Sequence, residues 1–170
     1  NEMNLQIQII NTPDKFRPMA QELVPPLVEL LRGLAAEEAE TMRQDRAIRE
    51  EKRRKGIPVH QGVPEQTALF KDHEARYGRL VQDRCTPQLL AREYGRSYGE
   101  PGKYDYLNTE CRLTFTMKSS ARAVVETFFS KGGLEMCHQF ILRDTGGGWK
   151  ISEVNYGFQS EPGKWHKDHI

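Results

Sequence analysis

The chain has 170 residues, with 25 Lys and Arg against 24 Asp and Glu, so its formal net charge is +1. A balance this close to neutral argues against a surface dedicated to nucleic acid, because phosphate binding requires a clustered excess of Lys and Arg. No apolar stretch is long enough to cross a bilayer, and the mean hydropathy is −0.72. The length fits one domain, 1–170, that buries a single core.

The cysteines point to a reducing compartment. Cys85, Cys111 and Cys137 are odd in number, widely spaced and without a Cys-x-x-Cys pair, which is typical of free thiols in the cytosol. The apolar run from Leu5 to Ile10 is too short for the apolar region of a signal peptide. We therefore expect a cytoplasmic protein.

The first half of the chain, about 12–94, has the pattern of a charged helical layer. The double proline at 25–26 predicts a break, after which a helix is expected to run to Lys55. Apolar residues recur at helical spacing only in the early turns of this helix, so its contact with the core should fade along its length. A second helix is predicted over 65–83, and Thr86 is expected to cap a short third one.

The second half, about 109–158, alternates apolar and polar residues with the period of two that marks half-buried strands. Four such runs are separated by turns rich in serine and glycine, the last turn being 146–148. They predict an antiparallel sheet of four strands or more, with Trp149 as a buried anchor after the glycine turn. Helices followed by a meander give an α+β fold in which the helices pack on one face of a bent sheet.

The middle strands carry apolar residues on both faces. Val124, Phe128 and Ile141 have the parity opposite to that of Val125 and Phe140. Apolar residues on both faces indicate that both are covered. The outer face is therefore expected to be covered either by a second copy, in a homodimer, or by the N-terminal helices.

The sequence contains no recognisable catalytic constellation. No serine has the Gly-x-Ser-x-Gly context of a nucleophile, and no helix pattern follows the glycines at 146–148 to aim amides at a phosphate. The tail from Trp165 to His169 holds two imidazoles and a carboxylate, but Lys167 among them argues against a metal site. We therefore expect neither an enzyme nor a bound cofactor or metal.

His138 shares the apolar face of its strand with Met136 and Phe140. A histidine in this place is either a hydrogen-bonded core residue or a general base whose pKa is lowered by burial. The core role is the more common of the two, and the sequence favours it.

Tyrosines gather around the segment that joins the helices to the sheet. Each combines a large apolar ring with one hydroxyl, which suits an interface anchor as well as a pocket lining or the rim of a core. The predicted partner-binding residues are these tyrosines and two aromatic residues near the C-terminus: Tyr94, Tyr98, Tyr104, Tyr106, Tyr156 and Trp165.

Five short segments occur in an order that resembles one family. In chain order they are Ser97-Tyr98-Gly99-Glu100-Pro101, Tyr104-Asp105, Gln139-Phe140-Ile141-Leu142, Trp149-Lys150-Ile151 and Lys164-Trp165. They resemble bacterial immunity proteins of the nuclear-transport-factor-2-like fold, which are encoded beside Rhs-type and other polymorphic toxins. The resemblance covers about the second half of the chain. It implies a cone-shaped fold with helices in the concave face of the sheet, and neutralisation of a cognate toxin's C-terminal domain by binding.

The same fold also occurs in ketosteroid isomerases, which leaves an alternative. The chain would then be a small-ligand binder or an isomerase-like enzyme that uses the pocket of the cone. Such an enzyme needs an Asp or His base opposite a tyrosine donor. The candidate pocket residues are Tyr94, Tyr104, Asp105 and His138.

Overall fold

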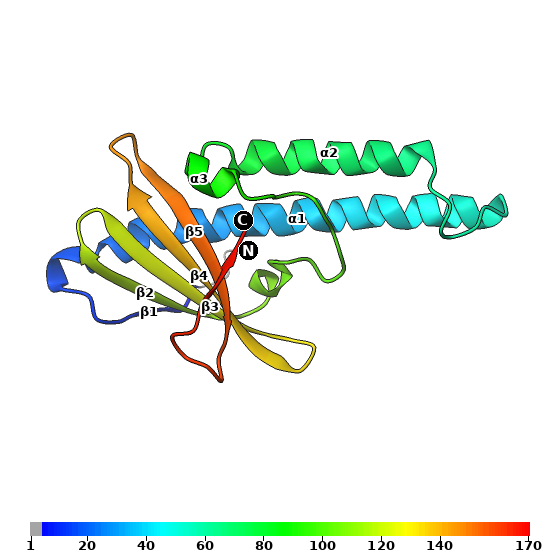
Figure 1. Cartoon of the computed structure of the whole chain (residues 1–170). Coiled ribbons are helices and arrows are strands. Elements are labelled where there is room, and N and C mark those ends of the chain that lie inside the picture. Colours follow the sequence, from blue (N-terminus) through cyan, green and yellow to red (C-terminus); the bar gives the residue numbers. More distant parts are fainter. Residues whose placement is uncertain (1–4) are drawn as a thin grey trace.

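The computed structural model describes residues 5–170, so residues 1–4 of the expected domain lie outside the described residues. Within 5–170 the fold is α+β, with three helices packed against a six-stranded mixed sheet (Figure 1). The predicted class is confirmed, and so is the order of a helical layer followed by a meander.

The elements have the following bounds. The helices are α1 (Met19–Arg54), α2 (Pro64–Val81) and α3 (Pro87–Leu90), with the 3-10 turns η1 (Asp14–Phe16) and η2 (Asp105–Asn108). The strands are β1 (Ile7–Ile9), β2 (Arg112–Ser119), β3 (Arg122–Lys131), β4 (Leu134–Asp144), β5 (Trp149–Phe158) and β6 (His166–Asp168).

The strands lie in the order β1-β2-β3-β4-β5-β6. β1 runs parallel to β2, and every other neighbouring pair is antiparallel. β2 to β5 are the four predicted strands, whereas β1 and β6 were not predicted. The free side of β5 pairs with β6 near one end, and near the other Thr86 donates its N–H to the carbonyl of Ile151 at 2.9 Å.

One face of the sheet, here called the inner face, is covered by the first half of α1. The buried side chains of this face come from β2, β3, β4 and β5, and each is at most 5% exposed. They are Leu113, Phe115, Met117, Ala123, Val125, Phe140, Leu142, Ile151 and Val154. From α1, nine apolar side chains between Ala20 and Ala35 join the same core, including Leu27 and Leu31. Burying this apolar area is the main favourable contribution to folding.

The predicted break at Pro25 and Pro26 is wrong, because α1 runs without interruption from Met19 to Arg54. The two prolines lack N–H groups, so the helix carbonyls four residues earlier, at Gln21 and Glu22, lose their usual donors. Both of those residues are exposed. Burial of the neighbouring leucines and valines outweighs the local cost of the missing hydrogen bonds.

The second half of α1 leaves the sheet and pairs with α2, and Figure 1 shows the two helices extending side by side beyond the strands. We call this hairpin the α1–α2 arm. Beyond Ala35 the buried residues of α1 are polar, namely Thr41, Asp45 and Lys52. The expectation that core contact fades along this helix is confirmed.

The opposite, outer face of the sheet has no helical cover from residues 5–170, since their helices pack on the inner face (Figure 1). The expectation that N-terminal helices cover it is therefore wrong. Ile141 is only 6% exposed, whereas Val124 and Phe128 are half-buried. The guanidinium of Arg112 lies 4.0 Å from the centre of the Phe128 ring, so part of this face is shielded by its own side chains.

Trp149 is not the buried anchor that the sequence predicts. It is the first residue of β5, pairs with Asp144 at the end of the sheet, and is half-buried. Ile151, two residues later, is 3% exposed and belongs to the core. The strand parity was correct, but Trp149 lies at the margin of the core.

This placement predicts an order of stabilities. Ile151→Ala should lower the free energy of unfolding by about 2 to 5 kcal/mol, because it removes buried methyl groups and leaves a cavity. Trp149→Ala should cost less than Ile151→Ala, because its side chain is already partly in water. Urea denaturation with unchanged m-values gives both numbers. A larger loss for Trp149→Ala would contradict the placement.

Candidate functional site

The structure does not bring the six predicted aromatic residues to one surface. Two of them, Tyr94 and Tyr98, pack against α2. Two others, Tyr104 and Tyr106, lie over the inner face with Tyr156 of β5 nearby. Trp165 lies against Gly157, on the side of β5 opposite to Tyr156.

Tyr98 contacts both helices of the arm, whereas Tyr94 packs on α2. The ring of Tyr94 stacks on Tyr77 at 6.3 Å between centroids, and the ring of Tyr98 meets His73 edge-on at 5.3 Å. The Tyr98 hydroxyl donates to Oδ1 of Asp45 at 3.4 Å. Both tyrosines are half-buried, so each keeps part of its surface for a partner.

A buried polar group lies beneath Tyr98. His73 is 0% exposed, and its Nδ1 lies 2.9 Å from Oγ1 of Thr41. Arg76 donates through Nε to Oε1 of Glu37 at 2.7 Å. The Nε2 atom of His73 has no hydrogen-bond partner among the described residues. Polar contacts of this kind fix the register of α2 on α1 without adding much stability.

His138 is the centre of a second polar network, on the inner face. It is 4% exposed, and its Nδ1 lies 2.8 Å from the hydroxyl of Tyr106. That hydroxyl lies 2.7 Å from Oγ1 of Thr127. On the other side of the ring, Nε2 is 3.9 Å from Oδ2 of Asp168. Burial, supported by the positive charge of Lys103, lowers the pKa of His138 to about 3.

Asp168 and Lys103 form the charged edge of this network. The Nζ atom of Lys103 is 3.1 Å from Oδ2 of Asp168 and also donates to the carbonyl of His169 at 2.5 Å. Burial lowers the pKa of Lys103. Burial alone would raise the pKa of Asp168, but the charge and hydrogen bond of Lys103, together with the backbone N–H and ring of His169, outweigh burial, so the pKa is lowered. The pair ties β6 to the segment before η2.

Tyr104 is a core residue. It is 1% exposed, with ring centroids 5.4 Å from His138 and 6.0 Å from Phe140. Burial raises the pKa of its hydroxyl well above the ordinary value, and that hydroxyl has no hydrogen-bond partner among residues 5–170. In this conformation Tyr104 cannot contact a partner.

Of the four pocket candidates, the structure brings together only Tyr104 and His138. Tyr94 lies on α2, and Asp105 accepts a hydrogen bond from Asn108 within η2. The acid beside His138 is Asp168, which the sequence did not single out as its partner. No local pattern could have identified it, because the contact depends on where the C-terminal segment packs.

The surroundings of His138 favour the core role. Its ring lies 4.8 Å from Phe129 and 5.7 Å from Tyr106, and Tyr104 covers a further side. A general base must reach the proton that it removes, and its pKa should lie near the working pH. A buried ring with a pKa of about 3 meets neither requirement in this conformation.

The inner face continues beyond η2 as a half-buried apolar surface at the end of the sheet near the β3–β4 turn. Its strand residues have the same parity as the core but are less covered, and the exposed Leu134 borders them. We call Phe129, Leu134, Met136, Tyr156, Phe158 and His166 the open-end patch. The rings of Tyr156 and His166 stack at 5.0 Å, and 54% of Leu134 is exposed.

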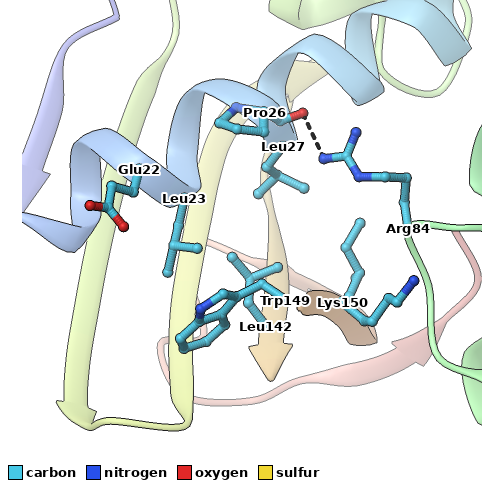
Figure 2. A pocket seen from close by; sticks show the side chains of 9 residues that line it. Glu22, Leu23, Pro26, Leu27, Arg84, Leu142, Trp149 and Lys150 are labelled. Carbon is cyan, nitrogen blue, oxygen red and sulfur yellow. Dashed lines mark hydrogen bonds between the residues drawn. The ribbon is translucent and has the colours of Figure 1, made fainter. Parts of the chain in front are cut away.

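A separate cavity of about 240 Å³ lies at the other end of β5, between β5, the start of α1 and the segment before α3 (Figure 2). Arg84 donates to the carbonyl of Pro26 at 3.1 Å, drawn as the dashed line in Figure 2. The residues lining the cavity are Glu22, Leu23, Pro26, Leu27, Arg84, Leu142, Trp149, Lys150 and Ile151.

Comparisons of the chain with protein-family models, curated proteins and solved structures found no match. Within residues 5–170, no three His, Cys, Asp or Glu side chains are grouped so that they could hold a metal ion. None of the helices in the described part of the chain has the length and apolar character needed to cross a membrane. The three cysteines are free, with Cys85 and Cys137 buried.

The pKa of His138 yields a prediction about acid stability. Its pKa is about 3 in the folded chain against 6.5 for the free side chain, so as pH falls the unfolded state takes up a proton first. Stability should therefore fall between about pH 6.5 and pH 3, by up to about 1.4 kcal/mol per pH unit from this group. Denaturation at several pH values measures the slope, and His138→Gln should reduce it.

The same residue can be followed directly by NMR. The ring protons of His138 should not titrate between pH 8 and pH 5 in the folded protein, whereas the free side chain has a pKa of 6.5 and titrates within this range. A midpoint for His138 between pH 6 and pH 7 would mean that water reaches the ring. That result would return it to consideration as a general base.

Proposed function

We propose that this chain is a bacterial immunity protein with a cone-shaped, nuclear-transport-factor-2-like fold, which binds and neutralises a cognate polymorphic toxin. The order of short segments that resembles this family supports the proposal. The α+β architecture, with helices on one face of the sheet, is compatible with the cone but does not by itself identify it.

The observation that carries the proposal is the open-end patch. Half-buried aromatic rings beside an exposed leucine have the composition of an interface hot spot, where aromatic residues are enriched and water is excluded on binding. Four of the six patch residues are aromatic or histidine rings, and Tyr156 is also one of the partner residues expected from the sequence. The rigid sheet beneath holds the rings in place, which lowers the entropic cost of binding.

Charges around the patch indicate the kind of partner surface that the patch would bind. Lys131 precedes the β3–β4 turn and, with Lys103 and His169, contributes positive potential at His138. Asp168, the acid beside His138, is already paired with Lys103, and Glu161 in the turn after Phe158 is paired with Lys164. We therefore propose that the toxin presents an apolar surface with acidic residues at its margin.

The alternative, a small-ligand or isomerase-like pocket inside the cone, has less support. It needs an accessible base opposite a tyrosine donor, whereas His138 and Tyr104 are packed against each other in the core. Of the partner residues expected from the sequence, Tyr156 belongs to the proposed open-end interface, whereas Tyr94, Tyr98 and Trp165 keep exposed surface outside it. The protein is expected to act in the cytoplasm.

The patch can be tested with one exposed residue. Leu134→Glu should weaken binding to the toxin encoded in the neighbouring reading frame by about 1 to 3 kcal/mol, because a carboxylate would enter an apolar contact. Co-purification and protection of the producing cell give the two readouts. The fold should be unaffected, since the leucine is already largely in water.

A matched control lies on the arm. Val59 is 89% exposed, so Val59→Glu makes a similar change far from the patch and should leave binding unchanged. Equal binding by both variants would exclude the patch as the interface. If the unmodified chain binds no toxin encoded beside it, the immunity function itself is wrong.

The apolar residues on the outer face of the sheet lead us to expect self-association. We propose that a second copy covers the outer face at Val124 and Phe128, which no helix within residues 5–170 covers; Ile141, on the same face, is already buried. Light scattering after size exclusion should show a dimer, and Val124→Glu should shift it to monomer. A strict monomer at high concentration would contradict the dimer and leave the toxin-binding proposal intact.

A further inference from the structure

The cavity in Figure 2 has an apolar floor. Leu23 and Leu27 of α1 line the cavity together with Leu142 and Ile151 of the sheet, and none of the four is more than 8% exposed. The half-buried indole of Trp149 lies beside this floor. An apolar body that entered would be in contact with hydrophobic side chains on several sides.

Two cations lie at one side of the cavity. Figure 2 shows Arg84 and Lys150 on the same side of Trp149. Arg84 uses one side-chain donor for the carbonyl of Pro26, and a guanidinium has five. Lys150 donates to the backbone carbonyl of Asp83. Neither cation is paired with a carboxylate of the described chain, so both charges remain available to an anion.

The opposite side of the cavity is negative. Glu22, which also lines the cavity, lies on the other side of Leu23 from Arg84 (Figure 2). Its backbone carbonyl also lacks the helical donor that Pro26 cannot supply. This end of the cavity would repel an anionic group, whereas the end with Arg84 and Lys150 would attract one.

We propose that this cavity binds a small monocarboxylate with an apolar body. The carboxylate lies against Arg84 and Lys150, and the body packs on Trp149 and the leucine floor. A volume of about 240 Å³ suits one ring or a short chain and falls below the range of drug-sized pockets. Glu22 excludes ligands that carry a second acid at the far end. The site is separate from the open-end patch and does not depend on the proposed toxin.

The test uses four defined probes on the whole chain. The first two are 3-phenylpropionate and hexanoate; adipate adds a second carboxylate to the six-carbon chain, and hexylamine reverses the charge. Saturable shifts of the Trp149 indole N–H signal in NMR report binding, with Trp165 as the internal control. The two monocarboxylates should shift the Trp149 signal, whereas adipate and hexylamine should have little effect.

Single substitutions test which charged side chains contribute to ligand binding. Arg84→Met and Lys150→Met should each weaken 3-phenylpropionate binding about tenfold, because a charge-assisted contact is lost. Glu22→Gln should allow adipate to bind. Arg79→Met, an exposed change on α2, is the matched control and should leave binding unchanged. If Arg84→Met proves unfolded by its melting curve, Lys150→Met and Glu22→Gln still decide.

Three results would overturn the proposal. The first is the absence of a saturable Trp149 shift with either monocarboxylate. The second is binding of hexylamine as tight as that of hexanoate, which would mean that only the apolar floor contributes. The third is unchanged affinity in folded Lys150→Met together with continued exclusion of adipate by Glu22→Gln.

Discussion

The packing of the first half of α1 across the inner face of the sheet is the contact on which the rest of the structure depends. A helix of 36 residues is about 54 Å long, whereas strands of 8 to 11 residues extend about 26 to 37 Å. The helix must therefore extend beyond the sheet. α2 pairs with the projecting half, and the arm in Figure 1 is the result.

The same packing leaves the other end of the inner face without a helix. Tyr104, η2 and the C-terminal segment cover its middle, and they enclose His138 with Tyr106, Thr127 and Asp168. Burial keeps the His138 ring neutral by lowering its pKa, which suits a structural role. Nearer the β3–β4 turn no other segment of the described chain covers this face, and the aromatic rings of the open-end patch are only half-buried. The proposed function depends on this change from core to surface along one sheet face.

Periodicity predicted the large elements well. The four strands β2 to β5 and the helices α2 and α3 follow the patterns of their own residues, and Thr86 accepts the expected capping hydrogen bond from Leu89 at 3.4 Å. β1 and β6 have three residues each, too few for an alternation to be recognised. The uninterrupted α1 was missed because tertiary burial outweighed a local rule about proline.

The candidate site was predicted less well, because the sequence does not show how deeply each side chain is buried. A tyrosine has the same side chain in the core and at the surface, so the sequence could not separate the buried Tyr104 from the half-buried Tyr98. The neighbourhood of His138 was foreseen, but its contact with Asp168 required knowledge of where the tail packs. Likewise, the two cations near Trp149 come from segments far apart in the chain.

If the proposed cognate toxin is identified, hydrogen exchange on its complex with this chain is the sharpest test of the proposed binding surface. Binding through the open-end patch should slow exchange at the β3–β4 turn and in the segment from β5 to β6, with the tip of the α1–α2 arm unchanged. Protection confined to the arm, or to the outer face of the sheet, would contradict the claim that the open-end patch is the binding surface.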